Sequence, residues 1–338
     1  MSTAPLAVGV AGVGSLGFHH ARLYGTLPDA RLVGVYDVRA ERAAEVASQL
    51  KTTAFPTFEA LLEQVEAVSI VTPTPEHHAT AMAAIAHGRH VLVEKPLAAT
   101  IPEAEALVAA AERAGIVLQT GHVERFNRAV RAAAPYLKGP RYIESDRVAP
   151  FGVRGSDVAV ILDLMIHDLD LVLSLVKEKV VDVRASGIGV LTKSVDIATA
   201  RIEFESGAVA NLTASRMARE RVRKLRIFQP SGYLSLDLAA GTGEFLRLRA
   251  DAMMLLAGAL AGGNSPPDLS KIVEEVPIDA PPGEPLALEL QSFVRAVRGL
   301  ESVAVSGRDG LEALRLAFRV LEAMGQAGQA TPAPRLVP

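Results

Sequence analysis

The sequence predicts an α/β protein in which a doubly wound parallel sheet precedes an α+β domain with a large, mostly antiparallel open sheet. The first third of the 338 residues alternates short apolar, β-branched runs with helical patterns. Later runs alternate apolar and polar residues with a period of two, and the pattern changes after Gly121. The length also suits two domains at roughly 150 residues each, and we place them at residues 1–122 and 123–338.

The apolar runs of the first domain are expected as buried strands, because each is short and bounded by Gly, Pro or Asp. They are Leu6–Val10, Leu32–Tyr36, Ala67–Val71, His90–Val93 and Val117–Gln119. Helical patterns separate them, at Ser15–Thr26, Arg39–Leu50, Phe58–Gln64, Glu76–His87 and Pro102–Ala114. Continuous apolar strands alternating with helices indicate a parallel sheet covered on both faces.

The second domain is expected to begin with helical segments and continue with strands separated by turns. The helices are predicted at Asn127–Leu137, Leu162–Val176, Leu286–Arg298 and Gly310–Met324. The extended runs are Tyr142–Arg147, Val181–Gly189, Ile197–Phe204, Ala208–Ser215, Lys224–Phe228 and Tyr233–Leu238. Strict alternation over Ala198–Phe204 is typical of an antiparallel sheet with one solvated face. The Pro-rich tail from Gly328 is expected to be loose.

Composition excludes several function classes. The formal charge of −3 and the 4% aromatic content do not favour nucleic acid as a partner. Cysteine is absent, which removes disulfides, a thiol nucleophile and thiolate metal ligands. The apolar run Ala252–Ala261 is too short to span a bilayer and is expected to be a buried helix or a flap against a partner. We therefore expect a cytoplasmic protein without membrane insertion.

A glycine-rich turn after the first strand predicts a dinucleotide site. The turn comprises Gly12, Gly14, Ser15, Leu16 and Gly17, with Val13 between the first two glycines. Glycines there allow a tight turn, close approach of a pyrophosphate, and close packing of helix on strand, while the helix N-terminus attracts phosphate. Asp37, at the end of the second strand, suits the adenosine ribose hydroxyls and favours NAD. Arg39 leaves NADP open, since a nearby Arg receives a 2′-phosphate.

Two segments at carboxyl ends of predicted strands are candidates for the nicotinamide side of the site. Thr72, Pro73 and His77 follow the strand Ala67–Val71, and Glu94, Lys95 and Pro96 follow the next. Ligands of open α/β sheets bind outside carboxyl strand ends. A lysine there can polarise a hydroxyl or exchange a proton with it. Ordinary alternatives are helix-start polarity for His77 and a solvated charge for Lys95.

Asp163 and His167 are spaced four residues apart on the predicted helix Leu162–Val176, so they share one face. Acids are costly to bury in so apolar a helix unless they have partners. The pair therefore indicates acid–base chemistry, with a structural core histidine oriented by Asp163 as the alternative. A metal site is disfavoured, because no second clear pair of ligands accompanies them.

Together these segments resemble the glucose–fructose oxidoreductase/inositol dehydrogenase/MocA family over nearly the whole chain. The resemblance rests on GVGSLG, TPTPEHH, GRHVLVEKPLAAT, GHVERFNRAV and the Asp163–His167 spacing. It implies a dinucleotide domain followed by a large open sheet, and reversible hydride transfer between a sugar-like secondary alcohol and a nicotinamide. It also implies that Lys95, Asp163 and His167 are catalytic, and that subunits associate as dimers or tetramers through the sheet.

A subgroup resemblance narrows the substrate. GHVERFNRAV with LDLMIHDLDLVLSL is similar to UDP-N-acetylglucosamine 3-dehydrogenase-like members. These oxidise a 3-hydroxyl to a 3-keto sugar, which a partner aminotransferase aminates for lipid A precursors. The sequence departs from the family at Val158–Leu162, where glycines are common, and from the subgroup at Arg128, where Pro is common.

A sugar nucleotide needs cations for its diphosphate, and Arg125 and Arg154 are the candidates, with Asn127 as a further substrate contact. Alternatively, Arg125 pairs with a structural carboxylate such as Glu94, and Arg154 is a solvated loop charge. Three other functions stay open: an inositol or free-sugar dehydrogenase, an imine reductase, and a non-catalytic dinucleotide-binding regulator. The joint presence of Lys95, Asp163 and His167 favours an enzyme.

Overall fold

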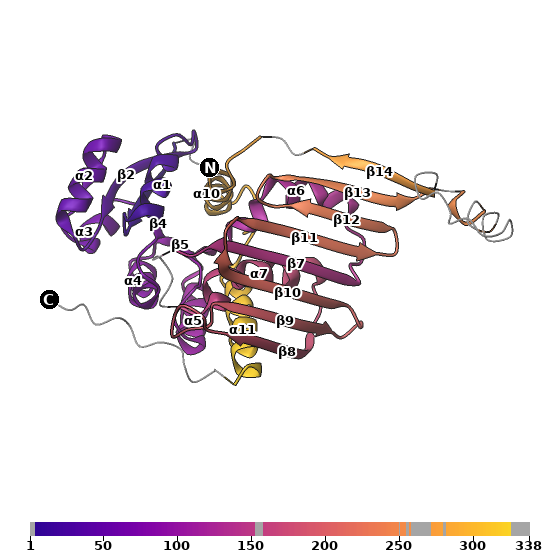
Figure 1. Ribbon diagram of the computed structural model, residues 1–338. Helices are drawn as coiled ribbons and strands as arrows, with labels where there is room; N and C mark the ends of the chain where they lie inside the picture. The colour runs from indigo at the N-terminus through magenta and orange to yellow at the C-terminus, as the bar shows by residue number, and fades with distance from the viewer. Residues whose placement is uncertain are drawn as a thin grey trace. The chain divides into compact units, whose positions relative to one another are not determined.

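A computed structural model describes residues 4–152, 158–249, 251–254, 257, 272–279 and 282–325. The chain forms two compact units, each made of segments from separate parts of the sequence, which can be followed by colour in Figure 1. The first contains the residues up to Phe126 together with Gly283–Leu316. The second contains Asn127–Pro282 and the end of the last helix from Ala317. Among the described helices, none has the length and apolarity needed to cross a membrane.

The first unit is built on a parallel sheet of six strands within the described residues, ordered β3-β2-β1-β4-β5-β6. The strands are β1 Leu6–Ala11, β2 Ala30–Tyr36, β3 Thr53–Ala54, β4 Ala67–Ile70, β5 His90–Glu94 and β6 Leu118–Gly121. Every residue of β1 and β4 is buried, as expected for central strands covered on both faces. The predicted parallel sheet is thus confirmed, with the short edge strand β3 added.

Helices follow the strands in the order that the sequence predicts. They are α1 Ser15–Tyr24, α2 Ala40–Leu50, α3 Phe58–Leu62, α4 Thr74–Ala86 and α5 Ile101–Ala114, followed by the 3₁₀ turn η1 Val123–Phe126. Local chemistry explains the start of α5, where Thr100 and Glu103 form a reciprocal capping box. Gly115, with a φ of 66°, ends that helix in the left-handed conformation.

A helix from late in the chain completes the first unit. Helix α10, Pro285–Val297, buries Leu290 and Phe293 in the same core as Leu6 and Tyr24. The predicted division at residue 122 therefore differs from the compact units, which assign Gly283–Leu316 to the first. The physical reason is that the apolar face of α10 finds its burial against α1 and the sheet of the first unit.

The second unit is a mixed sheet of eight strands in the described part of the chain, ordered β14-β13-β12-β11-β7-β10-β9-β8. Only β10 and β7 pair in parallel among these neighbours, so the predicted mostly antiparallel sheet is confirmed. The strands are β7 Tyr142–Pro150, β8 Val180–Ile188, β9 Ile197–Phe204, β10 Val209–Ala218, β11 Val222–Gln229, β12 Gly232–Asp237, β13 Thr242–Leu248 and β14 Val273–Ile278. Strands β13 and β14 were not predicted.

Helical segments cover one face of this sheet, and in Figure 1 they lie behind the strands. They are α6 Arg128–Ala133, the 3₁₀ turn η2 Ala134–Tyr136, the π-helical turn η3 Ile161–Met165, α7 Ile166–Val176 and the C-terminal part of α11 Gly307–Ala323. In β9, Ala198, Ala200, Ile202 and Phe204 are buried on that face. The residues between them lie on the other face, as the period-two alternation predicts.

Candidate active site

The glycine turn joins β1 to α1 and has room for a ligand on one side. Gly12 has a φ of +83°, and a Cβ on Gly17 would lie 1.8 Å from the Gly12 carbonyl oxygen. Only glycine fits at Gly17, because helix and turn approach so closely. A Cβ on Gly14 would meet nothing within 4 Å, and no side chain caps α1 at that residue. The open side of the turn is therefore available to a pyrophosphate at the start of the helix.

Asp37 follows β2 and faces this turn. Its Oδ2 accepts the Val13 N–H at 2.9 Å, and its Oδ1 accepts the Arg39 N–H at 3.0 Å and lies 3.5 Å from Arg39 Nε. The carboxylate is nearly buried, while the Arg39 side chain is 68% exposed. Arg42, which the sequence reading missed, donates from Nε to the Val13 carbonyl at 2.8 Å. The N–H and the carbonyl group of Val13 are thus each held by a charged side chain.

A groove of about 180 Å³ lies beside Asp37. It is lined by Tyr36, Asp37, Val38, Ala40, Ala43, Ala54, Phe55 and Pro56. Such a mainly apolar groove with one carboxylate suits a base and its ribose. The first unit therefore fits a nicotinamide dinucleotide, and contacts of Gly14 with the pyrophosphate and of Asp37 with the ribose stay predictions.

The segments after β4 and β5 are linked by His77, which the sequence reading assigned to the cofactor. The ring is 1% exposed, with Nε2 2.9 Å from the Thr72 carbonyl oxygen and Nδ1 2.8 Å from that of Pro96. Burial lowers the pKa of His77, although both carbonyls and Glu94 act against this. The ring thus contacts the backbone of the Thr72–Pro73 segment. Direct contact of His77 with the cofactor stays a prediction.

Glu94 ends β5 with its carboxylate directed into the unit. Its Oε1 lies 3.1 Å from Nε2 of His20 on α1, and its Oε2 accepts the Lys95 N–H at 3.2 Å. Burial raises the pKa of Glu94, but its interactions with His20 and Lys95 together outweigh burial and hold the pKa below its ordinary value. Lys95 follows at the carboxyl end of β5, half-buried, on the same edge of the sheet as the glycine turn.

Asp163 and His167 belong to the second unit. Asp163 lies in the π-helical turn η3 and His167 in the first turn of α7, and both are partly exposed. Asp168 and Asp170 are buried, and Asp168 forms a two-bond ion pair with Arg147 of β7, at 2.6 and 3.0 Å. This pair ties the start of α7 to the sheet. A π-turn inside a helix occurs frequently at functional sites.

The residues expected to bind the nucleotide of the substrate, Arg125, Asn127 and Arg154, are not shown to form one site. Arg125 Nη2 lies 3.4 Å from Asp309 Oδ1, so this guanidinium meets a carboxylate. Asn127 caps α6 by accepting the Ala129 N–H and donates Nδ2 to the Leu238 carbonyl. Arg154 lies outside the described residues. Substrate contacts of all three stay predictions.

The structure thus gathers two groups of predicted residues. The first unit brings the glycine turn, Asp37 and the Lys95 segment to one edge of its sheet, and the second places Asp163 and His167 on adjoining helical turns. The convergence of Lys95 with His167 stays a prediction. The sequence reading missed His20, whose partner Glu94 is 74 residues away, and no local pattern signals such a pair.

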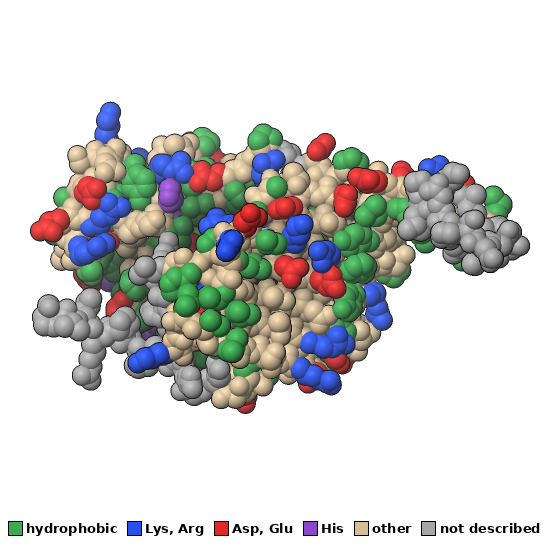
Figure 2. All heavy atoms as spheres, viewed as in Figure 1, with side chains coloured by type: hydrophobic (Ala, Val, Ile, Leu, Met, Phe, Trp, Pro, Cys, Tyr) green, Lys and Arg blue, Asp and Glu red, His purple; other side chains and the backbone are tan. Residues whose placement is uncertain are grey.

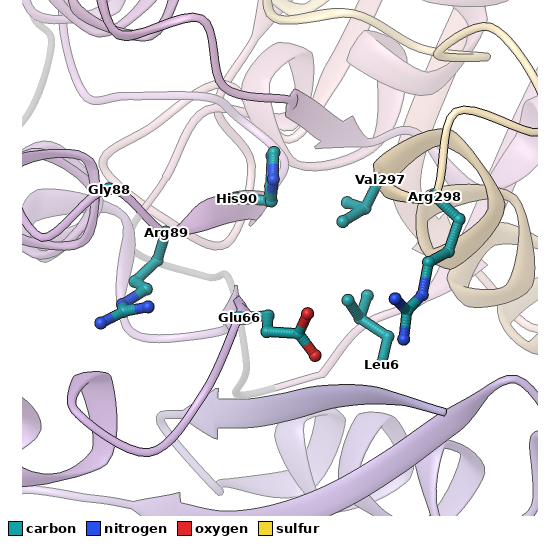
Figure 3. A pocket seen from close by; sticks show the side chains of 7 residues that line it. All are labelled: Leu6, Glu66, Gly88, Arg89, His90, Val297 and Arg298. Atoms are coloured by element: carbon teal, nitrogen blue, oxygen red, sulfur yellow. The ribbon is translucent and has the colours of Figure 1, made fainter. Parts of the chain in front are cut away.

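A further cavity of about 230 Å³ in the first unit lies at the amino edge of the sheet (Figure 3). It is lined by Leu6, Glu66, Gly88, Arg89, His90, Val297 and Arg298. Leu6 and His90 begin β1 and β5, so this cavity is at the strand ends opposite to the glycine turn. Ligands of open α/β sheets bind at the other edge, which excludes it as the candidate active site.

Comparison with known proteins agrees with this arrangement. A model of an oxidoreductase family with an NAD-binding Rossmann fold matches residues 6–122, and the Gfo/Idh/MocA C-terminal domain matches residues 140–235. UDP-N-acetylglucosamine 3-dehydrogenase of Acidithiobacillus ferrooxidans is 40% identical over 320 residues, which are 93% of this chain and 96% of the relative. The scyllo-inositol 2-dehydrogenase of Bacillus subtilis is 33% identical over 230 residues, 61% of this chain and 66% of that protein.

A solved structure of the Acidithiobacillus enzyme superposes with a TM-score of 0.87 at 39% identity, covering 97% of this chain and all of that one. The fold and the dinucleotide site define an oxidoreductase that uses a nicotinamide dinucleotide and acts on a CH–OH donor. The chain belongs to the glucose–fructose oxidoreductase/inositol dehydrogenase/MocA (Gfo/Idh/MocA) family.

Proposed function

We propose that this protein oxidises the 3-hydroxyl of UDP-N-acetylglucosamine to the 3-keto sugar, using NAD, in the cytoplasm. The observation that carries the proposal is the near full-length likeness to UDP-N-acetylglucosamine 3-dehydrogenase, in a chain that contains Lys95, Asp163 and His167. A keto sugar is the substrate type that an aminotransferase consumes. We therefore place the reaction before an amination in lipid A amino-sugar precursor synthesis.

The chemistry divides between the cofactor and the protein. The nicotinamide, when bound, supplies the acceptor for the hydride that leaves the sugar carbon. Lys95 and His167 hold the reacting hydroxyl and remove its proton, so that the C–O bond becomes a carbonyl. Asp163 orients the histidine or the sugar. Which of Lys95 and His167 takes the proton is left open.

NAD is the proposed cofactor because Asp37 lies at the ribose end of the site. A 2′-phosphate beside this carboxylate would be repelled. Arg39 would favour NADP by binding the 2′-phosphate, but its guanidinium is largely exposed and lies near Asp37 itself. The carboxylate is therefore expected to decide the preference.

The substrate assignment is tested by following NADH absorbance with UDP-N-acetylglucosamine, N-acetylglucosamine and a set of inositols. We expect kcat/KM for the UDP sugar to exceed that for the free sugar by roughly 100-fold or more, because the nucleotide supplies remote binding energy. Arg125→Ala should remove part of this advantage, with Arg131→Ala as a control. Equal rates with and without UDP contradict the proposal.

A free polyol is the second candidate substrate. It is favoured by the likeness to the scyllo-inositol dehydrogenase, which is 33% identical to this chain over 230 residues. In that case an inositol would be the best substrate, and Arg125→Ala would leave its kcat/KM unchanged.

We also propose that the protein is a homodimer or homotetramer that associates through the open face of the second unit's sheet. Tyr142, Phe228 and Tyr233 contact one another on this face, with Phe228 and Tyr233 stacked at a centroid distance of 4.6 Å. Figure 2 shows hydrophobic and charged side chains side by side on the sheet face turned to the viewer. Such a surface, partly apolar and partly ionic, fits a subunit interface.

A further inference from the structure

The residues on either side of Lys95 are each held by a buried histidine. Glu94, which precedes it, contacts His20 of α1, and Pro96, which follows it, has its carbonyl against His77 of α4. His20 and His77 are 0% and 1% exposed. The two histidines come from different helices, so the Lys95 segment is anchored from two independent points in the first unit.

The His20 contact fixes the Glu94 carboxylate. The structure gives His20 Nδ1 no hydrogen-bond partner among the described residues, while Nε2 lies 3.1 Å from Glu94 Oε1. A buried N–H without an acceptor is costly, so the ring proton belongs on Nε2, where it donates to the carboxylate. His20 thus acts as a donor that sets the direction of Glu94.

Glu94 transmits this constraint to Lys95. Its second oxygen, Oε2, accepts the Lys95 N–H at 3.2 Å. The carboxylate also packs closely against β6, since a Cβ placed on Gly121 would lie 2.8 Å from its Oε1. The backbone of Lys95 is therefore tied to a carboxylate that is itself fixed on two sides.

The His77 contact constrains the other side of Lys95. Its Nδ1 faces the Pro96 carbonyl at 2.8 Å, and its Nε2 faces the Thr72 carbonyl at 2.9 Å. A neutral ring carries one N–H and donates to one of these carbonyls, whereas a charged ring donates to both. In either state the ring lies between the segment after β5 and the segment after β4. The charges of Glu94 and Lys95 act on the pKa of this ring in opposite directions, since Glu94 raises it and Lys95 lowers it.

We propose that His20 and His77 are positioning residues that brace the Lys95 segment from its two sides and so aim the lysine at the substrate. The inference rests on the proposed catalytic role of Lys95. A misplacement of about 1 Å at a reacting group can cost roughly 100-fold in rate. Loss of either brace is therefore expected to lower kcat.

The brace itself is tested without turnover, by hydrogen exchange of the Lys95 amide in the full-length protein at single-residue resolution. His20→Leu removes the donor to Glu94, and we expect the Lys95 amide to exchange at least tenfold faster. His20→Gln retains an N–H donor at the place of Nε2 and should exchange within threefold of the parent protein. His90→Leu, which alters a histidine at the opposite end of β5, is the control for general loosening. No acceleration in His20→Leu overturns the proposal.

The two ring nitrogens of His77 permit a matched comparison. An asparagine amide takes the place of Nδ1 and a glutamine amide that of Nε2, so His77→Asn preserves the contact with Pro96 and His77→Gln that with Thr72. We expect kcat to fall at least fivefold further in His77→Gln than in His77→Asn. The dissociation constant of NADH, from its fluorescence, measures the effect on the cofactor separately in each variant. Equal kcat values in the two variants contradict the brace at Pro96.

The kinetic and exchange results separate this inference from the proposed function. Turnover that survives Lys95→Met would refute the catalytic role of the lysine. If Lys95→Met is inactive and the Lys95 amide of His20→Leu exchanges faster with kcat unchanged, positioning by His20 is refuted. Faster exchange together with at least a tenfold loss of kcat, restored in His20→Gln, supports it.

Discussion

At the scale of single residues, the Asp37 carboxylate has two tasks in one place. It accepts the backbone N–H groups of Val13 and Arg39, which holds the glycine turn, and it presents negative charge to the expected ribose site. Removing it should therefore weaken dinucleotide binding and also change cofactor choice. Arg39, at 68% side-chain exposure, is free to reorient toward a 2′-phosphate once the carboxylate is gone.

Asp37→Ser is expected to reduce the preference for NAD over NADP by at least tenfold, because the repulsion of the 2′-phosphate is removed. Dissociation constants for NADH and NADPH, measured by fluorescence, check this. The double variant Asp37→Ser/Arg39→Ala should lose the gained NADPH affinity. Tighter NADPH binding by the unaltered protein would show that Arg39 outweighs Asp37.

Lys95 and His167 are expected to act on the same hydroxyl. Since general acid–base groups contribute typically ~10²–10⁴-fold, Lys95→Ala and His167→Ala should each lower kcat by about 100-fold or more. NADH binding should stay within a few fold in both, as neither change touches the glycine turn. Normal turnover in both variants would refute the catalytic assignment, and Lys138→Ala provides a matched control for loss of a lysine.

At the scale of elements, buried charges hold the second unit's helix and turns in place. Arg147 and Asp168 tie α7 to β7, and Arg216 NH2 donates to the Val158 carbonyl ahead of the π-turn. The turn between β8 and β9 is also held by a buried carboxylate, that of Asp196. Asp196 Oδ2 accepts the N–H groups of Val190, Leu191 and Thr192 at 2.8–2.9 Å.

The Asp196 turn makes stability depend on pH. Burial raises the pKa of Asp196, but its hydrogen bonds lower it further, from 3.8 to about 2. Because the folded-state pKa is depressed, the stabilisation is complete above about pH 4 and is lost as the pH falls toward 2. Asp196→Ala should therefore cost roughly 2–4 kcal/mol of unfolding free energy at pH 7.

Urea denaturation at pH 7 and at stepwise lower pH measures this effect. Asp196→Asn preserves the acceptor oxygen without the charge, so its cost should be about 1 kcal/mol at pH 7 and should shrink as the pH falls below 4. A cost of Asp196→Asn that grows on acidification would contradict the assignment.

At the scale of the whole molecule, the open face of the eight-stranded sheet is the surface that the described helices leave uncovered (Figure 1). We expect light scattering at micromolar concentration to report a dimer or tetramer. Phe228→Lys should dissociate it, because a charge would replace the ring that stacks on Tyr233. Leu300→Lys, an equally polar change at a residue 54% exposed in the first unit, should not. A monomeric parent protein contradicts the expected assembly.

The sequence predicted the elements well wherever a single segment carries its own signal. The period of two in Ile197–Phe204 gave β9 its bounds, and the apolar runs gave the central strands of the first unit to within a few residues. The glycine turn and Asp37 were also identified, because glycine conformation and strand ends are local properties. Strands β13 and β14 were missed, since their mixed composition shows no clear alternation and their pairing partners define them.

The sequence by itself thus determined the strand and helix order, the glycine turn after the first strand, the position of Asp37 at the end of the second strand, and the family. Only the tertiary structure decided that α10 joins the first unit, that Arg125 meets Asp309 across 184 residues, and that His20 and His77 hold the segments around Lys95. The reason is physical: backbone conformation follows from neighbouring residues, whereas the partner of a buried polar group depends on which distant surfaces pack together to exclude water.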